Sequence, residues 1–85
     1  MKRSMKSKRV VSTCPWLAEI STKLFYRLEP RHQEIIKLRD RGHTWYEIGR
    51  LMGFSGSRAY QLHRTALIAL ARLLINAGKK IPWAD

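Results

Sequence analysis

The chain has 85 residues and a formal net charge of +11, because 17 lysines and arginines stand against 6 aspartates and glutamates. This length supports one domain with a small core. The positive excess is larger than solubility requires and has the sign that attracts phosphate, so nucleic acid is the leading candidate partner.

Several classes of protein are excluded by composition and spacing. The single cysteine, Cys14, cannot form an internal disulfide or a cysteine-rich zinc site, and the three histidines do not fall at zinc-finger spacing. No apolar run approaches the roughly 20 residues that span a bilayer, and no signal-peptide pattern follows the basic opening. The sequence also lacks a nucleophile spaced with its base and a glycine-rich phosphate loop. We therefore expect a cytoplasmic protein that is not an enzyme, has no catalytic residues, no metal and no cofactor, and does not contact a membrane.

The first segment, residues 1–12, is basic and has almost no apolar side chain. Such a segment cannot bury enough surface to offset the entropy of ordering, so we expect a disordered arm. The arm either lies along DNA phosphates or in a minor groove, or it is merely a solvated terminus. Its candidate phosphate contacts are Arg3, Lys6, Lys8 and Arg9.

Two helices are expected next. Pro15 suits the first turn of a helix, because proline has no amide to leave unsatisfied there. The apolar stripe of this first helix consists of Leu17, Ile20, Leu24 and Leu28. Pro30 opens a second helix, which Gly42 ends. The buried side of the second helix consists of Ile35, Ile36 and Leu38.

The clearest local signal starts at Thr44. Thr44 and Glu47 form a capping box, so a third helix begins there, and Gly53 ends it. Ser55 is the next N-cap candidate, and no glycine or proline interrupts the fourth helix between residues 57 and 76. A short capped helix, a turn with glycine and a second helix with polar first turns are typical of a helix-turn-helix.

The predicted fold is therefore an all-α, four-helix domain over residues 13–76, with a helix-turn-helix at about residues 44–70 and a tail over residues 77–85. Gly49 is expected to let the two helices of this motif cross closely. The predicted core consists of Ile35, Leu38, Trp45, Ile48, Leu51, Leu62 and Ala66. Met52 is also expected to be buried.

A family pattern runs through residues 28–70 in one register. It consists of Leu28-Glu29-Pro30-Arg31, Glu34-Ile35-Ile36, Leu38-Arg39, Thr44, Glu47-Ile48-Gly49, Ser55, Arg58, Gln61-Leu62, Ala66-Leu67 and Leu70. This pattern resembles region 4 of bacterial sigma factors. Response-regulator output domains share the leucine-proline-arginine opening, but the pattern from Arg58 onward favours the sigma resemblance. A bacterial or phage source is consistent with it.

The resemblance implies that the fourth helix reads DNA bases. It implies contacts from Arg58 and Gln61, and side-chain chemistry agrees, because Arg pairs with guanine and Gln with adenine. Ser57 and Tyr60 are further candidate base contacts, and Tyr60 packs on a thymine methyl, donates to phosphate, or is only a half-buried surface aromatic. Gly56, Ser57 and Tyr60 depart from many primary sigma factors, which leaves the ordinary promoter hexamer in doubt as the target. Candidate phosphate contacts are Thr44, Ser55, His63 and Arg64.

The apolar face of the fourth helix is wider than a small domain needs. We expect a homodimer contact or an RNA polymerase docking surface at Leu67, Leu70, Leu74 and Ile75; the alternative is that the first helix and Trp83 cover this face. The expected function is sequence-specific binding of double-stranded DNA in transcription regulation, at the nucleoid. The alternative is a protein-interaction module that mimics region 4 and binds RNA polymerase or a sigma-binding partner.

Overall fold

The computed structural model describes residues 14–83 of the chain, so the basic arm with Arg3, Lys6, Lys8 and Arg9 lies outside the described residues. Within residues 14–83 all regular elements are helical, which confirms the all-α class. In chain order they are the 3-10 helix η2 (Pro15–Glu19) and the α-helices α1 (Thr22–Phe25), α2 (Pro30–Asp40), α3 (Trp45–Met52) and α4 (Gly56–Asn76). None of these helices is long and apolar enough to cross a membrane.

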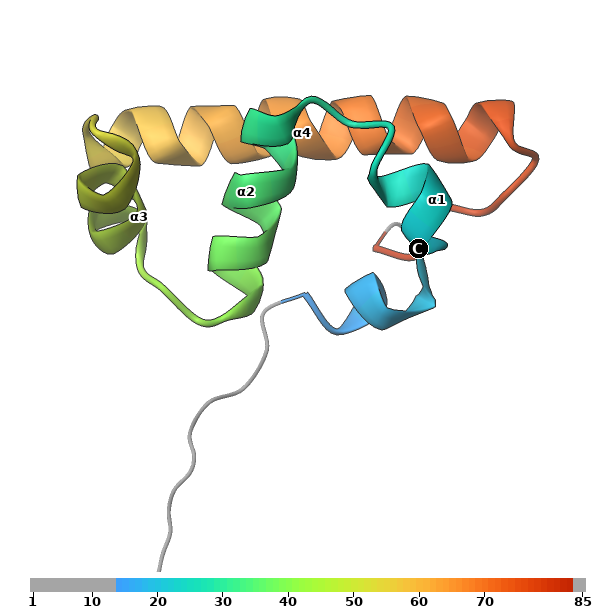
Figure 1. Ribbon diagram of the computed structural model, residues 1–85, viewed down its shortest axis with the longest axis horizontal. Coiled ribbons are helices and arrows are strands. Elements are labelled where there is room, and N and C mark those ends of the chain that lie inside the picture. Colours follow the sequence, from blue (N-terminus) through green and yellow to red (C-terminus); the bar gives the residue numbers. More distant parts are fainter. Residues whose placement is uncertain (1–13, 84–85) are drawn as a thin grey trace, which may run out of the picture.

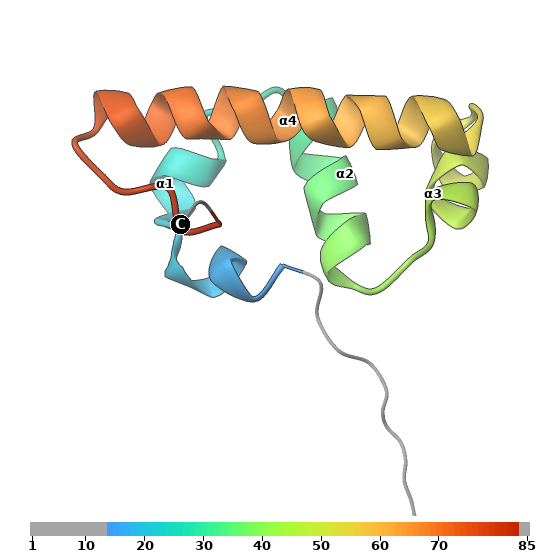
Figure 2. The same cartoon turned by 180° about the vertical axis from the view of Figure 1, so that it is seen from behind.

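Helix α4 is the spine of the domain. Figures 1 and 2, which view the molecule from opposite sides, both show α1, α2 and α3 extending from one side of α4. Helix α3 lies near the N-terminal end of α4, α2 lies near its middle, and α1 lies near its C-terminal end. No other helix of residues 14–83 lies on the opposite side of α4.

Local sequence chemistry explains the helix-turn-helix formed by α3 and α4. The backbone amide of Glu47 donates to the Thr44 hydroxyl (3.1 Å), and the Thr44 amide donates to the Glu47 carboxylate (2.9 Å), which confirms the capping box. Gly53 ends α3 with a φ of 90°, a conformation that glycine adopts at no steric cost. The Ser55 hydroxyl then accepts from the Arg58 amide (3.2 Å) and starts α4.

The core lies between α4 and the helices beside it. Its largest fully buried side chains are Ile35, Ile36, Ile48 and Leu70. Of the predicted core, Ile35, Leu38, Ile48 and Ala66 are buried, and Trp45 and Leu62 pack against it while partly exposed. Met52, also expected to be buried, is partly exposed in the same way.

The prediction that Leu51 belongs to the core is wrong, because 62% of its surface is exposed. Helix α3 lies at the end of the domain and packs through one face, which carries Ile48, Gly49 and Met52. Leu51 lies beyond the edge of that face, so most of its side chain stays exposed. Apolar character alone could not reveal the exposure of Leu51, since its neighbour Met52 is also apolar.

The prediction of one continuous first helix is also wrong. Ile20 and Ser21 leave the helical conformation, with ψ of 132° at both residues, and they separate η2 from α1. Short helices are marginal on their own, so packing decides their course. The bend allows both Leu24 and Phe25 to be buried, and Phe25 is a core residue that the apolar stripe missed.

The C-terminal segment folds back over the end of this core. The Lys79 amide donates to the carbonyl of Leu74 (2.9 Å), and the Trp83 ring lies 4.6 Å from that of Trp16. Trp16 and Trp83 both pack against the core cluster that contains Leu70 and Leu74. Residues of the expected tail therefore help to close the domain.

This closure corrects the predicted protein interface. Leu70 and Leu74 are only 0% and 2% exposed, so they belong to the domain's own core, and the prediction that they contact a partner is wrong. Trp16, Leu17 and Trp83 pack against the cluster that contains Leu70 and Leu74, so the alternative is correct for this part of the face. Ile75 is 60% exposed and Leu67 is partly exposed, so an interface at these two residues stays a prediction.

Candidate nucleic-acid interface

The open side of α4 carries a polar stripe in its N-terminal half. Ser57, Gln61 and Arg64 are exposed, and their spacing of four and three residues places them on one face of the helix. The Ser55 cap determines where α4 begins and hence where this stripe starts. Three of the predicted DNA-contacting residues are thus brought together on one accessible surface.

Arg58 and Tyr60 lie on opposite flanks of this stripe. Arg58 lines a groove beside α2, whereas the Tyr60 ring lies 5.4 Å from Trp45, the first residue of α3. The interplanar angle of 83° makes the contact between Tyr60 and Trp45 edge-to-face. The predicted base contacts therefore form a surface that is wider than one helix face and is bounded by α2 and α3.

The groove on the α2 flank contains a residue that the sequence reasoning missed. Arg31 and Arg58 both line this groove, which has a volume of about 320 Å³, together with Gln61 and Thr65. Both arginines are exposed, so two cations from different helices lie beside the polar stripe. Arg31 was not among the predicted DNA contacts. Its place in the sigma-like pattern was the signal that could have pointed to it.

The capping residues Thr44 and Ser55 can still donate hydrogen bonds to a bound molecule. The hydroxyl oxygens of Thr44 and Ser55 accept backbone amides, and each hydroxyl retains its proton as a donor. The nearby Glu47 carboxylate has a lowered pKa, mainly because it accepts from the Thr44 amide, and His43 lies 3.6 Å away. Glu47 therefore carries its negative charge at the start of α3, where the charge interacts favourably with the helix dipole.

His63 was a candidate phosphate contact, with a plain surface histidine as the alternative. Its ring is half-buried and lies 5.1 Å from Trp45, and its Nε2 atom is buried without a hydrogen-bond partner among residues 14–83. Burial and the positive charge of Arg39 lower the pKa of His63 to about 4. The ring is uncharged at neutral pH, so a phosphate contact from His63 would have to be made without a positive charge.

The lowered pKa of His63 predicts a pH-dependent stability. In the unfolded chain the group titrates near 6.5, so between pH 6.5 and about 4 the unfolded state binds more protons than the folded state. Stability is then lost as the pH falls through this window. Because the ring is partly exposed, we expect a loss of about 1–2 kcal/mol, after a discount for solvent screening.

Urea unfolding of the parent and of His63→Gln at pH 7 and pH 4 measures this effect. The glutamine variant keeps the carboxylates that also titrate in acid, so it serves as the control. We expect the parent to lose more stability than the variant between the two pH values. An equal loss in both proteins would contradict the lowered pKa.

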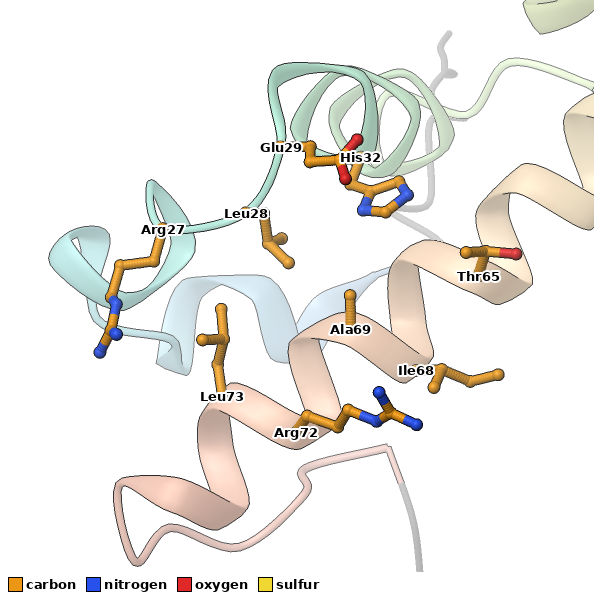
Figure 3. A pocket seen from close by; sticks show the side chains of 9 residues that line it. All are labelled: Arg27, Leu28, Glu29, His32, Thr65, Ile68, Ala69, Arg72 and Leu73. Atoms are coloured by element: carbon orange, nitrogen blue, oxygen red, sulfur yellow. The ribbon is translucent and has the colours of Figure 1, made fainter.

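A second groove lies near the other end of α4. It has a volume of about 450 Å³ and runs between α4 and the segment that joins α1 to α2. Figure 3 shows the side chains of Leu28 and Leu73 pointing toward each other across it, with Arg27 and Arg72 reaching outward. Ile68, at the same groove, is 55% exposed. This groove is largely apolar with the charged residues Arg27, Glu29 and Arg72 in its lining, and it adjoins the groove beside the polar stripe, because His32 and Thr65 line both.

The comparisons with known proteins agree with the geometry. The family model described as "Sigma-70, region 4" matches residues 24–72, which is more than half of the chain. The match extends from the second half of α1 through α2 and α3 into α4, and it leaves η2 and the folded-back C-terminal segment outside. No curated protein and no solved structure matches the chain. The chain therefore belongs to the sigma-70 region 4 family, whose helix-turn-helix binds DNA in transcription.

Proposed function

We propose that this protein is a sequence-specific transcription regulator that inserts the N-terminal half of α4 into the major groove of double-stranded DNA. The observation that carries the proposal is the open polar stripe of Ser57, Gln61 and Arg64, with Arg58 and Tyr60 on its flanks. In a helix-turn-helix the first turns of the second helix face the base edges. The net charge of +11 supports binding to the phosphate backbone of DNA in the cytoplasm.

The residues of this surface fall into two groups with separate tasks. Gln61 pairs with adenine and Arg58 with guanine, because both side chains can form two hydrogen bonds to these bases. Arg31, Arg64 and the capping hydroxyls contact phosphates and hold α4 in register. The residues that read sequence and those that supply general affinity can therefore be distinguished by mutation.

Arg58→Ala and Gln61→Ala are expected to reduce discrimination between a selected duplex and a random duplex by roughly 1–3 kcal/mol each. The selected duplex comes from enrichment of bound genomic fragments, and fluorescence anisotropy gives both affinities. Arg72→Ala is the matched control, since Arg72 is an exposed arginine of the same helix about 21 Å further along. We expect it to leave discrimination unchanged.

The salt dependence of binding provides the second readout. Arg64→Ala should weaken binding to every duplex alike and flatten the slope of log affinity against log salt by about one unit. If Arg58→Ala and Gln61→Ala also weaken binding to all duplexes equally, these residues contact phosphate. The assignment of base reading to them is then wrong.

Docking on RNA polymerase is a second candidate function, and the groove in Figure 3 is the observation that favours it. An apolar floor with the charged residues Arg27, Glu29 and Arg72 around it suits an amphipathic segment of a larger protein. A protein that acts mainly in this way would bind random duplex negligibly even at low salt. Co-purification with polymerase that is lost in Ile68→Lys would support docking through this groove.

A further inference from the structure

Trp45 connects the three main helices of the domain. Its ring lies 4.1 Å from the guanidinium carbon of Arg39 on α2, 5.4 Å from the Tyr60 ring and 5.1 Å from the His63 ring, both on α4. Cation–π and edge-to-face contacts of this kind are favourable and prefer a defined geometry. Trp45 is thus held by both neighbouring helices.

The backbone around Trp45 is also held in place. Thr44 and Glu47, which form the capping box, lie on either side of Trp45 in the sequence. In addition, an Arg39 side-chain nitrogen donates to the His43 carbonyl (2.9 Å). Arg39 therefore contacts both the ring of Trp45 and the chain that leads into it. The position of the Trp45 ring is determined from two directions.

This arrangement restrains Tyr60 at the edge of the polar stripe. Tyr60 is 46% exposed, so one part of its ring packs on Trp45 and the other faces solvent. A side chain that is already restrained loses less rotamer freedom when it binds. Tyr60 is the only phenylalanine, tyrosine or tryptophan of α4, and its neighbours Gly56 and Ser57 are short.

We propose that Tyr60 is a specificity-determining residue that packs its exposed ring edge on a thymine methyl group, and that Trp45, held by Arg39, is the positioning residue. This inference rests on the proposed binding of α4 in the major groove. There, the C5 methyl of thymine is the apolar group that distinguishes it from the other bases. A phosphate contact from the Tyr60 hydroxyl would give no such preference.

Replacement of thymine by deoxyuridine tests the contact, because it removes the methyl group and keeps the base pair. We expect the parent protein to bind the selected duplex about fourfold more weakly when one particular thymine is replaced, the effect of burying one methyl group. Tyr60→Ala should bind the thymine and deoxyuridine duplexes equally. A thymine-to-deoxyuridine ratio that is unchanged in Tyr60→Ala would overturn the reading role of Tyr60.

Trp45→Leu and Trp45→Phe test the positioning role. The leucine variant should lose most of the thymine preference, and the phenylalanine variant, which retains an aromatic ring, should retain most of it. Arg39→Gln, which keeps Trp45, should reduce the thymine preference to an intermediate value. This variant tests the positioning role if Trp45→Leu does not fold. Tyr46→Ala is the control, because Tyr46 is an aromatic residue of α3 that is 67% exposed; it should leave the ratio unchanged.

The outcomes separate this inference from the proposed function. If Trp45→Leu binds the selected duplex with the full thymine preference, only the positioning role is wrong. If Trp45→Leu is unfolded, a full thymine preference in Arg39→Gln leads to the same conclusion. If replacing each thymine of the selected duplex by deoxyuridine leaves the affinity unchanged, the role of Tyr60 is wrong, while sequence-specific binding stands. If no duplex is preferred over random DNA, both the inference and the proposed function are wrong.

Discussion

Ile48→Asp is expected to unfold the domain. The Ile48 side chain has no exposed surface and packs in the cluster that joins α2, α3 and α4. A carboxylate at this point would be buried among apolar side chains, at a cost of about 4–5 kcal/mol or more. Small domains have a total stability of roughly 5–15 kcal/mol, so little would remain. Far-UV circular dichroism should show loss of the helical signal.

Leu51→Asp is the matched control for this prediction. Leu51 lies three residues further along the same helix and is 62% exposed. A carboxylate near the end of α3 opposes the helix dipole, so we expect a loss of less than about 1 kcal/mol and a folded protein. If Leu51→Asp unfolded the chain while Ile48→Asp remained helical, the described orientation of α3 would be wrong.

Gly49→Ala is expected to destabilise the helix-turn-helix by about 1–3 kcal/mol and to weaken DNA binding with it. A Cβ atom on Gly49 would overlap the backbone carbonyl oxygen of Phe54 and lie 2.9 Å from the carbonyl of Ser55. The turn cannot easily move away, because the amides of Gly53 and Phe54 both donate to the Gly49 carbonyl (2.7 and 2.8 Å). The tight crossing of α3 and α4 therefore requires glycine at this position.

The sign of the change makes this prediction sharp. In an ordinary helix the same replacement stabilises by roughly 1 kcal/mol, because alanine has the higher helix propensity. Thermal unfolding and anisotropy measure the two effects. Gly56→Ala provides the comparison: its Cβ would lie 3.3 Å from the nearest atom, the Tyr46 amide nitrogen, so only a small adjustment is needed. A Gly49→Ala protein as stable as Gly56→Ala would show that the crossing is looser than described.

The candidate site could be predicted only in part from the sequence. The first turns of α4 were identified, because the Ser55 cap and the family pattern determine where that helix starts and which residues follow. The groove that Arg31 shares with Arg58 could not be identified, because these residues are far apart in the chain and meet only when α2 packs on α4. The neutral state of His63 likewise depends on its burial and on Arg39 from another helix.

Features whose causes lie within a few residues could be derived from the sequence. The capping box at Thr44, the left-handed turn at Gly53 and the cap at Ser55 are local hydrogen-bond and backbone effects, and all three are present in the structure. The burial of Ile48 also followed from local patterning, because it lies at the centre of the apolar face of α3.

Features that depend on contacts between distant segments could be seen only in the folded domain. The break at Ile20 and Ser21, the exposure of Leu51 and the burial of Leu74 beneath the folded-back C-terminal segment are of this kind. Periodicity indicates which side chains are apolar and how they are spaced along a helix. It does not indicate which other segment covers them, because burial depends on how the helices pack in three dimensions.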